Sequence, residues 1–146
     1  MDERIQNFLK NQILVSLSCL NEQGFPHCFT CYYSYDDKKQ RILFKSSGNT
    51  RHEKHLRERP DLAGTIHPDE VSKVHILGAQ IKGTIHRSTD MFYLLEAGTL
   101  YHLKNPAALA LPGVIWVLHL HTVELTDSML GIGQRLKWHK EDAQSD

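Results

Sequence analysis

The sequence predicts a mainly β fold of the α+β class: a small antiparallel barrel of six or more strands with short helices at its ends. Short segments rich in β-branched and aromatic residues alternate between apolar and polar and are separated by tight turns. Three other segments are predicted as helices: residues 3–11 carry apolar residues at helical spacing, whereas 50–59 and 91–103 have capping residues at or just before their start and a proline beyond them. The chain has 146 residues, of which 40% are hydrophobic and 23% charged, which is typical of one globular domain.

The first part of the chain reads as one helix followed by a three-stranded meander. Residues 3–11 place Ile5, Phe8 and Leu9 on one face of a helix. Tight turns at 21–24 and 36–40 separate the strands that follow. We expect those strands at 13–20, 25–35 and 41–46.

The second part mixes helices with longer strands. Pro60 ends a helix over 50–59, since proline cannot continue it. Gly78 and Gly83 predict a bulge or bend in a long strand. We expect strands at 62–67, 74–87 and 114–126, and a third helix over 91–103. Residues 1–140 then form a single domain, and 141–146 form a polar tail.

Composition and charge exclude several classes of protein. The 17 basic residues equal the 17 acidic ones, which argues against a nucleic-acid partner because polyanion binding needs excess positive charge. No apolar run approaches the roughly 20 residues that cross a bilayer. The first residues, MDERIQNFLKN, do not resemble a signal peptide. We therefore expect a cytoplasmic protein with no membrane or nucleic-acid partner.

The cysteines and histidines invite a metal or redox interpretation. Cys28 and Cys31 form a C-x-x-C motif, but on a strand they point to opposite faces, so we interpret them as structural. His119 and His121 share a strand face, yet no third ligand is placed near them, and none of the ten histidines is assigned to a metal. We expect no metal site.

The junction between residues 46 and 52 carries the clearest chemistry. A helix N-terminus presents free N–H groups and the positive end of the helix dipole, which together favour a phosphate. Thr50 fits an N-cap with Glu53 three residues on, and Arg51 can hold a phosphate with two hydrogen bonds. Ser46 and Ser47 add hydroxyls. The alternative is a well-capped surface helix whose charges are only solvated.

The order of several short segments resembles the pyridoxamine-phosphate-oxidase-like superfamily of FMN-binding split β-barrels. These segments are GFPH at 24–27, ILFKSS at 42–47 before TRH at 50–52, RPDLAGTI at 59–66 and AQIKGTIHR at 79–87. Together with LTDSMLGIGQRLKW at 125–138, they resemble more narrowly the YhbP-like group of small bacterial proteins. The resemblance covers residues 1–140 and implies a split β-barrel that forms a homodimer, with FMN at the subunit interface.

The resemblance also implies which residues hold the cofactor. The family's phosphate-binding Ser-Arg-Lys triplet falls on Thr50, Arg51 and His52, so a histidine stands where the family has lysine. The flavin-contacting glutamine of the family falls on Gly78, and Gln80, on the same strand face, takes its place. The candidate cofactor-binding residues are Thr30, Lys45, Ser46, Ser47, Thr50, Arg51, His52, Gln80 and Trp138.

The sequence leaves alternatives for the role of Trp138 and for the activity. Trp138 either folds over the partner's flavin or pins the C-terminus, and Thr30 lines the pocket with its strand neighbours. The implied function is a flavin-dependent oxidoreductase acting on a small molecule, with no catalytic residue assigned. The alternatives are a non-catalytic carrier or sensor of flavin or haem, and an interaction domain without cofactor.

Overall fold

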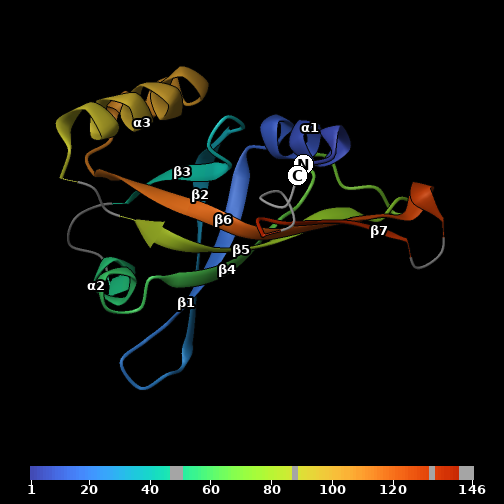
Figure 1. Cartoon of the computed structure of the whole chain (residues 1–146), viewed down its shortest axis with the longest axis horizontal. Helices are drawn as coiled ribbons and strands as arrows, with labels where there is room; N and C mark the ends of the chain where they lie inside the picture. Colours follow the sequence, from blue (N-terminus) through green and yellow to red (C-terminus); the bar gives the residue numbers. More distant parts are fainter. Residues whose placement is uncertain (47–50, 87–88, 132–133, 142–146) are drawn as a thin grey trace.

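A computed structural model describes residues 1–46, 51–86, 89–131 and 134–141, with only the backbone of 51–53 described (Figure 1). Within these residues the chain forms a closed six-stranded antiparallel barrel with one added strand, so the predicted fold class is confirmed. The strands are β1 Leu14–Leu20, β2 Pro26–Asp36, β3 Arg41–Ser46, β4 Asp61–Ile66, β5 Leu77–His86, β6 Val114–Asp127 and β7 Arg135–His139. The helices are α1 Glu3–Asn11, α2 Arg51–Glu58 and α3 Met91–Lys104, with short 3₁₀ turns at Pro106–Ala110 and Ser128–Leu130.

The sheet order β3-β2-β1-β4-β5-β6-β7 closes because β3 also pairs with β6. Two strands change partner along their length. β2 pairs with β1 from Pro26 to Tyr32 and with β3 from Tyr33 to Asp36. β6 pairs with β3 over its first half and with β7 over its second half. These changes of partner split the barrel, and in Figure 1 β7 continues the sheet away from α3.

Inward-facing apolar side chains fill the barrel. Val15 and Leu17 of β1, Ile81 of β5 and Leu118 of β6 are almost fully buried, as their period of two predicts. The buried face of α1 adds Ile5, Phe8 and Leu9 to the same core. A second, smaller core lies under α3, where Ala97 and Tyr101 pack on Leu43 and Val117 from the outer faces of β3 and β6.

The predicted elements agree with the structure except in three places. β5 begins at Leu77, because residues 74–76 leave the sheet: the Ile76 N–H bonds the Ser128 hydroxyl, and Val74 is 92% exposed. Gly78 makes no bulge, since its register with β6 is unbroken. No strand was predicted at Arg135–His139, where the structure has β7.

The bulge predicted at Gly83 is confirmed. Lys82 pairs with Thr122 but Gly83 with Leu120, so His121 is the extra residue on β6. A Cβ atom on Gly83 would lie 2.3 Å from the carbonyl oxygen of His119, so no larger residue fits there without movement of the backbone. No helix in the described part of the chain is both long and apolar enough to cross a membrane.

Candidate functional site

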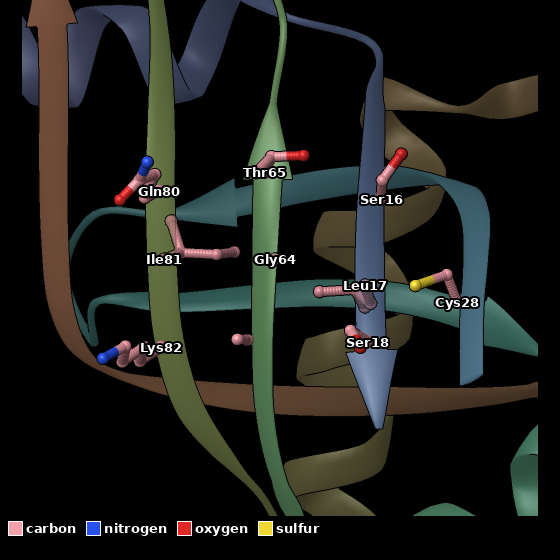
Figure 2. A pocket seen from close by; sticks show the side chains of 10 residues that line it. Ser16, Leu17, Ser18, Cys28, Gly64, Thr65, Gln80, Ile81 and Lys82 are labelled. Carbon is pink, nitrogen blue, oxygen red and sulfur yellow. The ribbon is translucent and has the colours of Figure 1, made fainter. Parts of the chain in front are cut away.

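A shallow trough crosses the outer face of the barrel over β2, β1, β4 and β5 (Figure 2). Its volume is about 320 Å³, at the lower end of the range for small-molecule sites, which is roughly 300–1,000 Å³. The trough is lined by Ser16, Leu17, Ser18, Cys28, Ala63, Gly64, Thr65, Gln80, Ile81 and Lys82.

Two cross-strand rows form the floor of the trough. In the first row, Ser16 pairs with Thr30 on one side and with Thr65 on the other, and Thr65 pairs with Gln80. The hydroxyls of Ser16 and Thr30 lie 3.1 Å apart. The structure thus places two predicted cofactor residues, Thr30 and Gln80, in one row.

The second row runs parallel to the first, with Ser18 between Cys28 and Ala63, and with Lys82 beyond Ala63. These side chains are short except at the β5 end. Hydroxyls therefore lie along a floor of mostly short side chains. In Figure 2 the Thr65 hydroxyl points toward Ser16, whereas the polar groups of Gln80 and Lys82 point away from β4.

The donor set suits the polar edge of a flavin ring. Hydroxyls of Ser16, Ser18 and Thr65 line the trough, the Gln80 carboxamide and the Lys82 ammonium lie at its β5 edge, and no carboxylate among the described residues lines it. A flavin presents carbonyl oxygens and ring nitrogens, which pair with such donors. The residues present therefore fit a flavin.

The predicted phosphate site lies at the start of α2. Ser47 and Thr50 lie outside the described residues, as do the side chains of Arg51 and His52. The backbone helix begins at Arg51, within one residue of the start predicted from the sequence. Ser46 ends β3 and is buried.

Two side chains of α2 hold the helix against the hairpin of β1 and β2. Lys54 forms an ion pair with Glu22 in the hairpin loop. The buried His55 ring packs edge-on against His27 of β2, with 5.6 Å between ring centroids. The helix is thereby fixed to the strands that form the trough.

Lys45 and Trp138 are directed elsewhere within this chain. The Lys45 ammonium donates to the carbonyl of Ala108 at 2.8 Å and lies 3.3 Å from His102 Nε2, beneath α3. Because side chains alternate along β3, Lys45 points to the opposite face from Ser46. Trp138 is 6% exposed and packs in the barrel core beside its β6 partner Val123, where it anchors β7.

Comparison with known proteins identifies the family. The family model described as pyridoxamine 5'-phosphate oxidase matches residues 1–107. The chain belongs to the pyridoxamine 5'-phosphate oxidase family. One relative, UPF0306 protein PM1958 of Pasteurella multocida, is 30% identical over 142 residues, which is 96% of this chain and 93% of the relative. UPF0306 protein YhbP of Escherichia coli is 27% identical over 140 residues, with 93% of this chain and 96% of the relative covered.

Solved structures share the fold of this family member. A haem-binding protein from Mycobacterium smegmatis superposes with a TM-score of 0.79 at 15% identity, covering 99% of this chain and 61% of that longer chain. A FAD-binding protein from Mesorhizobium loti superposes with a TM-score of 0.69 at 15% identity, covering 87% of this chain and 95% of that one. At these identities the likeness concerns the fold.

Several residues of the trough were missed by sequence reasoning. Ser16 and Ser18 belong to no motif, and Thr65 lies in the family-like segment at 59–66 but was assigned no role, although all three alternate with apolar neighbours. What the sequence does not reveal is that β1 lies between β2 and β4, which brings these short side chains together.

The histidine pair on β6 is bound to protein hydroxyls. His119 Nε2 lies 3.0 Å from the Tyr93 hydroxyl. His121 Nε2 lies 3.1 Å from the Thr84 hydroxyl, which donates to Asp61 at 2.8 Å. Because Thr84 uses its only proton on Asp61, His121 Nε2 is the donor. Among residues whose side chains are described, no three His, Cys, Asp or Glu are grouped to hold a metal ion.

The C-x-x-C pair is also separated. Cys28 is exposed at the trough, while Cys31 points to the opposite side of β2 and is half-buried. Burial raises the pKa of the Cys31 thiol to about 12. The structural interpretation of this motif agrees with that geometry.

Proposed function

We propose that this protein binds FMN on the trough, in a homodimer whose second copy completes the site, and that it acts as an oxidoreductase on a small molecule. The single observation that carries the proposal is the row of Thr30, Ser16, Thr65 and Gln80 across four strands. It joins Thr30 and Gln80, which were predicted from the sequence to bind the cofactor, to Ser16 and Thr65, which were not, on one face of the sheet.

The floor of the trough supports the ring of the cofactor. Leu17 and Ile81 point into the barrel and are about 1% exposed, so they hold the strands in place beneath the ring. The outward hydroxyls and the Gln80 amide then bind its polar edge. Hydrogen bonds at fixed positions orient a ring, whereas a wholly apolar floor leaves it free to slide.

The start of α2 supplies the phosphate site in this proposal. The backbone N–H groups of its first turn and the Arg51 guanidinium bind the phosphate, helped by the hydroxyls of Ser46, Ser47 and Thr50. His52 adds a further hydrogen-bond donor, and unlike a lysine at this position it is positively charged only when protonated.

The trough is open on its outer side, and this openness supports the homodimer in the proposal. A flavin that lies on a sheet face still exposes its other face to water. A partner barrel against the same surface excludes that water and provides the opposite wall. When bound, FMN supplies hydride or electron transfer. The chain's own residues bind and orient the ring, and they leave room above it for a substrate.

An absorption spectrum tests the cofactor directly. The purified full chain is mixed with FMN, desalted and scanned, and a second sample is treated with haem in the same way. Retained flavin bands are expected. A Soret band with no retained flavin would favour a haem carrier, and a colourless protein in both samples would favour an interaction domain without cofactor. Either result would end the flavin proposal.

The phosphate assignment is tested with Arg51→Ala. Loss of a charge-assisted hydrogen bond should weaken FMN binding by about 1.5–3 kcal/mol, and riboflavin, which has no phosphate, should bind both proteins equally. Arg59→Ala, just beyond the other end of α2, is the matched control and should leave the affinity unchanged. Equal FMN affinity in wild type and Arg51→Ala would remove Arg51 from the site.

A further inference from the structure

A second hollow lies next to the trough, over β5, β6 and β7. Its volume is about 150 Å³, and it is lined by Gln80, Lys82, Thr122, Val123, Glu124, Lys137 and His139. Lys82 lines this hollow, the trough and a third hollow beside Asp61 and His121. It therefore stands where three depressions of the surface meet.

The two lysines of this hollow lack partners in the described part of the chain. Neither the Lys82 nor the Lys137 side chain has a hydrogen bond or an ion pair there, although both line a concave surface. Some lysines are engaged, such as Lys10 with Asp37 and Lys39 with Glu96, each at 2.6 Å, whereas Lys82 and Lys137 line one hollow together. The chain has zero net charge, so the positive charge gathered here by the two lysine side chains results from the arrangement of the strands.

The carboxylate in the hollow is already used. Glu124 Oε1 lies 2.6 Å from Arg135 Nη1, and this contact lowers the pKa of Glu124. Lys137 acts on Glu124 only through space. With Glu124 neutralised by Arg135, the charges of Lys82 and Lys137 are not balanced by any other carboxylate lining the hollow.

Neutral donors complete the hollow. Gln80 pairs across the sheet with Glu124, and Lys82 pairs with Thr122, so the Gln80 amide and the Thr122 hydroxyl lie beside Lys82. Glu124 lies between Gln80 and Lys137. In Figure 2 the Lys82 amine and the Gln80 amide point away from β4. Ammonium, amide and hydroxyl groups in one concave surface are the donors that bind an oxyanion.

We propose that this hollow, centred on Lys82 and Lys137, binds the oxyanion group of a small molecule, a phosphate or a carboxylate. The site does not depend on bound flavin. Because Lys82 also lines the trough, a ligand anchored here by its anionic group extends toward the place proposed for the ring. Together with the proposed flavin site, on which this part of the inference rests, that placement implies that the substrate is an anionic small molecule.

Titration of the ¹⁵N-labelled full chain with inorganic phosphate, without flavin, tests this proposal. Saturable shifts are expected at the amides of residues 80–82, 122–124 and 137–139. Lys82→Met and Lys137→Met should each weaken phosphate binding about fivefold or more, and Lys82→Arg should retain it. Lys38→Met removes the same charge from an exposed turn residue and should change nothing.

A parallel titration with acetate separates the two anions. If acetate competes with phosphate, the site takes carboxylates too, and if it does not, the site is specific for phosphate. Shifts confined to other surfaces, or equal binding by Lys82→Met and Lys38→Met, would overturn the proposal. It would also be overturned if Lys82→Met dissociated a dimer while phosphate left the hollow unshifted, since Lys82 would then pair with an acidic residue of the second copy.

Discussion

The guanidinium of Arg41 donates a 2.7 Å hydrogen bond to the carboxylate of Asp36, and both side chains are buried. The two residues form the last cross-strand pair of β2 and β3. The same guanidinium lies 5.1 Å from the centre of the Tyr93 ring and 3.4 Å from the Glu96 carboxylate. One buried cation thus joins the β2–β3 turn to α3.

Asp36→Asn should destabilise the protein strongly. Removing one partner of a buried ion pair costs roughly 3–5 kcal/mol in the free energy of unfolding, and the half-exposed Glu96 carboxylate, 3.4 Å from Arg41, offsets only part of that loss. Urea denaturation followed by circular dichroism measures the change. The adjacent Asp37→Asn is the control, because Asp37 pairs with Lys10 at the surface, where solvent screens the interaction. Equal losses in the two variants would show that Arg41 does not depend on Asp36.

Substitution of two glycines by alanine should have opposite effects. Gly83→Ala places a Cβ atom against the His119 carbonyl and should lower stability by about 2 kcal/mol or more. Gly98→Ala adds a Cβ with nothing within 4 Å of it, in the middle of α3, and should raise stability by about 0.5–1 kcal/mol. Thermal unfolding of both variants gives the signs. A stabilised Gly83→Ala would mean that the β6 bulge adjusts freely.

The three cysteines should differ in their reaction with iodoacetamide at pH 8. The thiolate is the nucleophile, and burial raises the pKa of both Cys31 and Cys19, whereas Cys28 is exposed at the trough. Peptide mass spectrometry should find Cys28 alkylated first, and all three only in urea. Cys31 labelled as fast as Cys28 would contradict the described orientation of β2.

Most elements were predictable because their signals are local. Alternation on β6 and the helical spacing of α1 each reflect one buried face. β7 was missed because it has five residues, three of them exposed and polar or charged, and only Leu136 and Trp138 face inward. Its pairing partner is β6, the strand just before it in the chain.

The candidate site was less predictable because it depends on register. Gln80 and Thr30 lie 50 positions apart in sequence and share a row only through β1 and β4. The partner of Lys45 likewise comes from a distant segment, since the 3₁₀ turn after α3 supplies the Ala108 carbonyl that accepts its hydrogen bond. No local pattern reports such contacts between distant segments.

The central claim is tested most directly by measuring how tightly FMN binds to a variant whose trough is filled by larger side chains. Ser16→Leu/Thr65→Leu replaces two short side chains of the floor, and Thr99→Leu, on the exposed face of α3, is the control. Fluorescence quenching should give binding at least about tenfold weaker for the filled trough, or about 1.4 kcal/mol, and unchanged binding for the control. FMN binding that is equally tight in the filled variant, with its fold intact by circular dichroism, would place the cofactor elsewhere and contradict the account.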